Sequence, residues 1–157
     1  MGTEERREIP GPERRRFPRG GRRATDLPGR HPRVLVADSY EGARRPVIRY
    51  LDHFNFDVAA AADGRSLLEE VVAQSPAVIL IDSQLEKSSR GLLGETSQLQ
   101  QIPAILFVGG VTEASESDRT AVRVAASLVK PFQLAAMLET VRGVLRAQMR
   151  ARIAAAG

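Results

Sequence analysis

Three charged residues follow short apolar segments, in positions where they could share one small polar site. Asp38 closes "RVLVAD", Asp82 closes "AVILID", and Lys130 follows "SLV". An apolar run that ends in an acid is typical of a strand buried on both faces of a sheet. Ligands of open α/β sheets bind beyond the carboxyl ends of the strands. Each residue alone could be a helix cap, a turn acid or a solvated loop lysine, but the set of three favours a shared site.

The lysine is unusual in this sequence because the chain otherwise uses arginine. Lys87 is the only other lysine among 23 basic residues. A compact ammonium suits a small polar site better than the wide guanidinium of arginine does. Pro131 follows directly, and we expect it to hold the turn that points Lys130 inward and to begin the last helix.

The elements that would position these residues alternate along the chain. Strands are expected at 33–38, 57–61, 77–82, 103–108 and 127–129. Helical patterns are expected at 41–54, 63–75, 115–125 and 133–153, with at most a short helix from Leu92 to Leu99 inside the polar segment 83–101. Strands separated by helix-length segments predict an α/β fold, with a five-stranded parallel sheet and helices on both faces.

Two of the helical patterns carry specific signals. Asp63 stands where it would cap the helix over 63–75. The last helix has an apolar stripe at helical spacing, formed by Leu134, Leu138, Val141, Leu145 and Met149.

Composition limits the chemistry further. The 157 residues contain 43% hydrophobic side chains, which fits one domain with an aliphatic core. There is no cysteine, so disulfides, thiolate metal sites and a cysteine nucleophile are excluded. Two histidines are too few for a histidine metal cluster. The sequence shows no membrane-spanning run and no secretory apolar core, and we therefore expect a cytoplasmic protein without a membrane partner.

The basic charge is concentrated in the first part of the chain. Residues 1–33 hold ten arginines and five acidic residues, while the formal charge of the whole chain is +4. Because residues 1–32 are rich in proline and glycine and poor in large apolar residues, they are predicted to be a disordered tail. The tail is interpreted as a solvated leader, with an arm that binds nucleic acid as the alternative.

The body of the chain, residues 33–153, resembles the receiver domain of two-component response regulators. The resemblance is carried by "VLVADS", "FDVAAAADGRSLLE", "AVILIDSQL", "IPAILFVGG" and "AASLVKPF", in that order. Each segment alone is weakly specific, whereas the ordered set is specific for the fold. The resemblance implies a flavodoxin-like, doubly wound receiver fold for this domain.

The same resemblance implies a role for each of the three charged residues. Asp82 would accept a phosphoryl group, Lys130 would contact the carboxylate and then the phosphoryl oxygen, and Asp38 with Asp82 would hold Mg²⁺. The implied partners are a histidine kinase or phosphotransfer protein as donor and a downstream signalling protein. The chain would be a signalling protein and not an independent enzyme, because no Gly-rich phosphate loop or full catalytic constellation accompanies these residues.

The chain also departs from the family pattern. Ser39 replaces the second acid of the first corner, Val108 replaces a hydroxyl residue, Ser127 replaces an aromatic residue, and Glu86 lies near the place of the usual proline. Glu41 could lean into the site or could simply be a helix-start acid. These departures indicate an atypical receiver. They leave two readings open beside the tail hypothesis: a phosphorelay protein, or a scaffold that works without phosphorylation.

Overall fold

The computed structural model describes residues 32–109 and 120–156. Its centre is a parallel sheet of five strands in the order β2-β1-β3-β4-β5. The strands are β1 (Arg33–Ala37), β2 (Asp57–Ala61), β3 (Val78–Asp82), β4 (Pro103–Val108) and β5 (Arg123–Val129). The predicted fold class is therefore confirmed. The predicted disordered tail, residues 1–32, falls almost wholly outside the described residues and stays a prediction.

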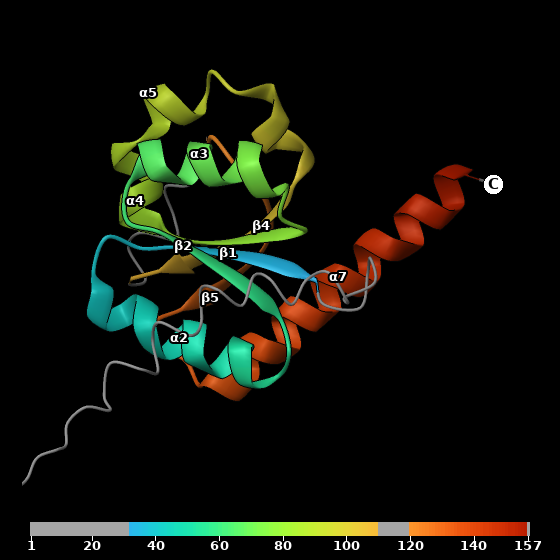
Figure 1. Cartoon of the computed structure of the whole chain (residues 1–157), viewed down its shortest axis with the longest axis horizontal. Coiled ribbons are helices and arrows are strands. Elements are labelled where there is room, and N and C mark those ends of the chain that lie inside the picture. Colours follow the sequence, from blue (N-terminus) through green and yellow to red (C-terminus); the bar gives the residue numbers. More distant parts are fainter. Residues whose placement is uncertain (1–31, 110–119, 157) are drawn as a thin grey trace, which may run out of the picture. The chain divides into compact units, whose positions relative to one another are not determined.

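Helices cover both faces of this sheet (Figure 1). One face carries α3 (Gly64–Gln74), α4 (Ser83–Ser88), α5 (Arg90–Leu93) and the 3-10 helix η3 (Ser97–Gln101), and the other carries α2 (Glu41–His53) and α7 (Leu134–Ala156). The chain runs one way along the sheet from β1 to β2 and the other way from β2 to β3 and from β3 to β4. Because such crossovers are right-handed, connections that run in opposite directions place their helices on opposite faces.

Each face has its own hydrophobic core. Side chains that meet the first face include Leu67, Val71, Leu85, Leu93 and Leu99. Side chains that meet the second face include Val47, Leu51, Met137, Leu138 and Val141. Strands β3 and β4 are buried along their whole length, because residues pointing to either face find a core. This burial explains why their sequences are continuous apolar runs.

The start of α3 confirms the predicted cap. The Asp63 carboxylate accepts a hydrogen bond from the backbone N–H of Ser66 at 2.8 Å, and the Ser66 hydroxyl accepts one from the Asp63 N–H. This reciprocal pair is a capping box. The backbone hydrogen bond from Ser66 holds the pKa of Asp63 below its ordinary value. The cap is therefore fully charged at neutral pH.

The strand β5 begins earlier than the sequence indicated. The predicted helix over 115–125 is wrong at its end, because Arg123–Ala125 belong to β5; residues 115–119 lie outside the described residues. The predicted strand 127–129 is correspondingly too short. Alanine and serine have little intrinsic preference for strands, so hydrogen bonding to β4 decides the conformation here, with Pro103 opposite Arg123.

The polar segment 83–101 contains more helix than predicted. It forms α4 directly after β3, then α5 and η3, in place of one short helix from Leu92 to Leu99. Helix α4 begins at once because Asp82 caps it, accepting hydrogen bonds from the backbone N–H groups of Gln84 and Leu85. The polar composition hid the buried leucines on which this segment packs.

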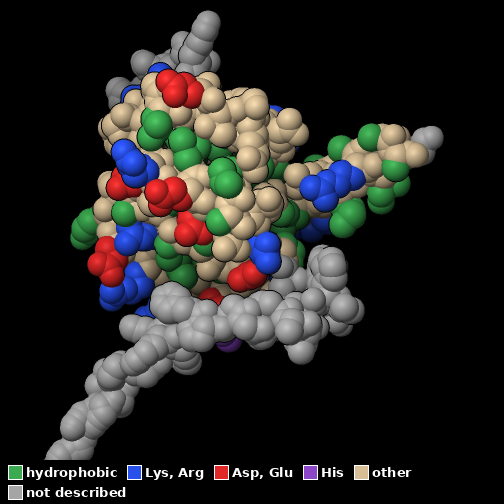
Figure 2. Space-filling model, turned by 45° about the horizontal axis from the view of Figure 1, so that its top comes forward, with side chains coloured by type: hydrophobic (Ala, Val, Ile, Leu, Met, Phe, Trp, Pro, Cys, Tyr) green, Lys and Arg blue, Asp and Glu red, His purple; other side chains and the backbone are tan. Residues whose placement is uncertain are grey.

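The last helix differs from its prediction at both ends. It begins at Leu134, so Pro131 is not its first residue, and the Lys130–Pro131 peptide bond is cis. Leu138 and Val141 are buried as the apolar stripe predicts, but Met149 is 56% exposed. Figure 2 shows why: the C-terminal part of α7 projects from the body, with hydrophobic and basic side chains along it.

Among the helices of the described ranges, none has the length and apolar character needed to cross a membrane.

Two adjacent valines of α3 provide a test of this packing. Val71 is fully buried and Val72 is 65% exposed. Val71→Ala should lower the free energy of unfolding by about 2 kcal/mol, because two methyl groups leave a packed core. Val72→Ala should change it by less than about 0.5 kcal/mol, since alanine is also the better helix former. Urea denaturation of both variants checks this, and equal losses would contradict the assigned orientation of α3.

Candidate functional site

The three charged residues singled out in the sequence meet at one edge of the sheet. The ammonium Nζ of Lys130 lies 2.6 Å from Oδ1 of Asp82 and 3.3 Å from Oδ2 of Asp38. Asp38 follows β1, Asp82 ends β3, and Lys130 follows β5. Because all five strands are parallel, their carboxyl ends lie at the same edge, and the lysine side chain spans the distance from β5.

Backbone contacts hold Lys130 in this position. Its N–H donates to the carbonyl oxygen of Val108 at 2.8 Å, which extends the pairing of β4 with β5 by one residue. Beyond the cis proline, the ring of Phe132 packs against Phe107 of β4 with 4.7 Å between ring centroids. The residues on both sides of the lysine are therefore fixed to β4, and the side chain is directed toward β3 and β1.

All four carboxylate oxygens of the two aspartates have a partner. Asp82 Oδ2 accepts from the N–H groups of Gln84 at 3.0 Å and Leu85 at 3.3 Å. Asp38 Oδ1 accepts from the N–H of Tyr40 at 3.0 Å. The remaining oxygen of each aspartate contacts the Lys130 ammonium. The two carboxylates are 5% and 7% exposed as residues, and this complete pairing offsets the cost of burying them.

Arg44 is a further part of the site that the sequence did not reveal. One of its terminal nitrogens donates to the backbone carbonyl oxygen of Asp38 at 2.7 Å. This contact ties the end of β1 to the first turns of α2. The only sequence signal was an arginine six residues after the acid, which is too common to single out.

The structure places several residues that the sequence analysis marked beside the site. Ser39 is exposed, Val108 is buried in the core at 4% exposure, and Ser127 is exposed on β5. Glu41 forms an exposed ion pair with Arg45 on α2, so it is a helix-start acid and does not enter the site. The three charged side chains therefore meet without a second acid or a hydroxyl from these positions.

The donors at this edge fit a hard divalent cation only in part. Mg²⁺ is usually bound by one or two carboxylates together with water and phosphate oxygens, and Asp38 with Asp82 meets that minimum. The two oxygens without a backbone partner are also the two that contact Lys130. No cluster of three or more acidic or histidine side chains suited to a metal occurs within residues 32–109 and 120–156. A cation here would have to share these oxygens with the ammonium.

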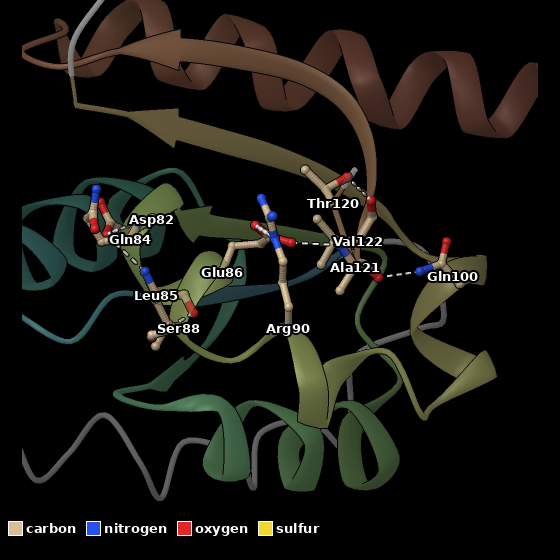
Figure 3. A network of polar contacts seen from close by, with 10 residues as sticks. All are labelled: Asp82, Gln84, Leu85, Glu86, Ser88, Arg90, Gln100, Thr120, Ala121 and Val122. Carbon is tan, nitrogen blue, oxygen red and sulfur yellow. Dashed lines mark hydrogen bonds and ion pairs between the residues drawn. The ribbon is translucent and has the colours of Figure 1, made fainter. Parts of the chain in front are cut away.

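A third buried carboxylate lies on α4, the helix that Asp82 caps. Glu86 on α4 is 1% exposed, and its two oxygens contact Nε of Arg90 at 2.9 Å and the N–H of Ala121 at 2.6 Å. Figure 3 shows this network between α4 and the residues just before β5. The sequence marked Glu86 only as a departure from a family proline. Its burial depends on the position of residues 120–122, which local pattern does not reveal.

The contacts of Lys130 predict how the free energy of unfolding changes at alkaline pH. Partial burial acts to lower the pKa of Lys130, but the hydrogen bond to Asp82 and the charges of Asp82 and Asp38 outweigh it, so the pKa lies above its ordinary value of 10.5. A raised pKa stabilises the fold below pH 10.5, and this stabilisation is lost as the pH rises through the folded-state value. The difference in unfolding free energy between wild type and Lys130→Met should be constant from about pH 8 to 10 and should narrow above that range.

Urea denaturation across this pH range measures the difference. Lys87→Met is the matched control, because Lys87 is exposed on α4 and should show no such narrowing. A difference for Lys130→Met that stays constant above pH 10.5 would contradict the charged contact with the two aspartates.

Two ion pairs of the same spacing test the burial of Glu86. Glu86 with Arg90 and Glu41 with Arg45 are both i,i+4 pairs, but the Glu86 side chain is 1% exposed and the Glu41 side chain is 62% exposed. Glu86→Ala should lower the free energy of unfolding by about 3 kcal/mol, because Ala121 loses its acceptor and Arg90 its partner. Glu41→Ala should cost less than about 1 kcal/mol. Similar losses in urea denaturation would show that Glu86 is not buried as described.

Comparison with known proteins supports the fold. No protein-family model matches the sequence, and no curated protein matches it at a significant level. Among solved structures, the chemotaxis response regulator CheY4 of Vibrio cholerae is 25% identical with a TM-score of 0.62, and the match covers 73% of this chain and 98% of that one. A CheY-like receiver domain protein of Methanospirillum hungatei JF-1 is 20% identical with a TM-score of 0.64, covering 76% and 98%.

A third match is to part of a larger protein. NtrX from Brucella abortus, solved in complex with ADP, is 22% identical with a TM-score of 0.69, and the match covers 80% of this chain but only 28% of that one. These structures share the fold with the present chain at low sequence identity. The strand order β2-β1-β3-β4-β5 and the similarity to several solved receiver domains agree. The body of this chain therefore has the fold of the response-regulator receiver domains.

Proposed function

We propose that this chain is a signalling protein of the receiver type that accepts a phosphoryl group on Asp82 and acts by protein–protein contact. The observation that carries the proposal is the contact of the Lys130 ammonium with both aspartates, 2.6 Å from Asp82 and 3.3 Å from Asp38. This is the arrangement expected of a carboxylate nucleophile held beside a cation.

The chemistry assigned to Asp82 is a phosphoryl transfer. A carboxylate oxygen attacks the phosphorus of the donor, and the new O–P bond forms as the bond from phosphorus to the donor's nitrogen or oxygen breaks, with its electron pair leaving on the donor. The ammonium of Lys130 then neutralises part of the added negative charge. The N–H groups of Gln84 and Leu85 keep the carboxylate from turning during the attack.

Asp38 and Asp82 are the residues proposed to hold Mg²⁺. The ion would supply positive charge to the phosphoryl oxygens. Because Ser39 offers no second acid, and because Lys130 contacts the same oxygens, binding at this pair should be weak. The donor partner is proposed to be a histidine kinase or a phosphotransfer protein, and the recipient of the signal a downstream signalling protein.

A second candidate function is a binding module that works without phosphorylation. A ligand changes a conformational equilibrium only through groups that bind it better in one state. The resemblance places Val108 and Ser127 at the positions of the hydroxyl and aromatic groups that would respond to a phosphoryl group. Val108 is buried in the core and carries no hydroxyl, and Ser127 is a small exposed residue of β5, so neither supplies such a group. The exposed apolar side chains Met149 and Ile153 on the projecting part of α7 favour protein contact in either case.

Incubation with acetyl phosphate and Mg²⁺, followed by intact mass measurement, tests the phosphoacceptor role. Wild type should gain one phosphoryl group, and Asp82→Asn should gain none because the nucleophile is removed. Lys130→Met should react roughly tenfold or more slowly, as expected when a charge-stabilising group is lost. Asp57→Asn is the control, since Asp57 pairs with Arg33 at the opposite end of the sheet.

The outcomes separate the two candidates. An adduct that persists in Asp82→Asn would place the modification elsewhere and refute the assigned acceptor. No adduct on wild type under saturating donor would refute the phosphorelay proposal and leave the phosphorylation-independent module. The alternative that the arginine-rich tail binds nucleic acid concerns residues outside the described ranges and stays untested, as does the favoured interpretation of a solvated leader.

A further inference from the structure

Glu86 is a buried charged residue that the proposed function does not use. Its carboxylate is 1% exposed, and both oxygens are engaged: Oε1 with Nε of Arg90 at 2.9 Å, and Oε2 with the N–H of Ala121 at 2.6 Å. A buried carboxylate is costly unless it is paired and hydrogen-bonded. A glutamate kept in such a place needs a reason beyond filling space.

The contacts of Glu86 join two parts of the chain. Glu86 belongs to α4, whereas Ala121 precedes β5 by two residues. The carbonyl oxygen of Ala121 accepts a hydrogen bond from the side-chain amide of Gln100, so its backbone is held on both sides. Figure 3 shows the two contacts converging on this residue. A hydrogen bond therefore connects helix α4 to the segment just before β5.

The other end of α4 contacts the proposed phosphoacceptor. Asp82 caps the helix, and its Oδ2 accepts from the N–H groups of Gln84 and Leu85. A helix of six residues is too short to be stable by itself, so its placement depends on its cap and its outside contacts. The direction in which Asp82 presents Oδ1 to Lys130 thus depends on where α4 lies.

We propose that Glu86 is a positioning residue for Asp82, and that it couples the acceptor to the start of β5. The hydrogen bond from Ala121 to Glu86 holds α4 in place. It thereby fixes the N–H groups of Gln84 and Leu85, which orient the Asp82 carboxylate. The same connection operates in reverse, because coupling between two sites is reciprocal. A change at Asp82 alters the cap of α4, and Glu86 carries the change to Ala121. The part of this proposal that concerns phosphoryl transfer rests on the proposed function.

Amide hydrogen exchange on the full-length protein tests the coupling in both directions. Glu86→Gln should raise exchange at Gln84 and Leu85, and Asp82→Ala should raise exchange at Ala121, each by roughly fivefold to tenfold. Each value is taken relative to the amide of Leu35 in the fully buried centre of β1, which reports global unfolding. The matched controls are Glu41→Gln, from the exposed pair on α2, and Asp57→Ala, which should leave all three amides unchanged.

A phosphorylation assay adds a readout that a merely structural residue would not change. With acetyl phosphate, Glu86→Gln should lower the rate constant at saturating donor by roughly fivefold or more, with little change in the donor concentration for half-maximal rate. Arg90→Lys, which keeps the positive charge, should stay close to wild type. If Glu86→Gln fails to fold, Arg90→Gln replaces it, because the Arg90 side chain is 37% exposed.

The outcomes are decisive. Exchange at Gln84 and Leu85 that rises no more than at Leu35 in Glu86→Gln would show that Glu86 is only structural and would overturn the proposal. Unchanged exchange at Ala121 in Asp82→Ala would do the same for the coupling. If wild type accepts no phosphoryl group, the proposed function fails while the exchange measurements still decide the coupling.

Discussion

The contact of one ammonium with two buried carboxylates is the constraint on which this end of the molecule depends. Asp38 and Asp82 lie at the ends of neighbouring strands, and two like charges so close and so little exposed would repel each other without a cation between them. Lys130 supplies that cation from β5, across β4. The position of the lysine in turn requires β5 to pair with β4 up to its last residue. The site and the edge of the sheet therefore stabilise each other.

The sequence was sufficient to predict the parts of the fold that depend on local pattern. Strands β1, β3 and β4 are buried on both faces, and their continuous apolar runs identify them. Asp38 directly after β1 and Asp82 at the end of β3 mark two of these strand ends. The cap at Asp63 needs only residues that lie three apart. The three charged site residues could be predicted because parallel strands bring their carboxyl ends to one edge, whatever the details of the helices.

The features that could not be predicted depend on contacts distant in the sequence. The start of β5 is set by pairing with β4, because its alanines and serine have no strong preference of their own. Helix α4 exists because Asp82 caps it and because Leu85 is buried. Glu86 resembles a surface residue in the sequence, and one of the two partners of its buried carboxylate, Ala121, lies 35 residues later. Arg44 contacts a backbone oxygen, which leaves no signature in side-chain spacing.

The resemblance in sequence implies that Val108 and Ser127 stand where receiver domains carry switch groups. Val108 and Ser127 offer no polar link between the acceptor and β5, since one is a core valine and the other points to solvent. Yet a polar path from Asp82 to the start of β5 does exist, through the capped α4 and the clamp of Glu86 on Ala121. It leads to the amino end of β5, whereas Lys130 marks its carboxyl end. Asp82 is thus connected to both ends of β5: to the carboxyl end through Lys130, and to the amino end through α4 and Glu86. In the proposed coupling, a change in the charge of Asp82 acts on β5 at both ends.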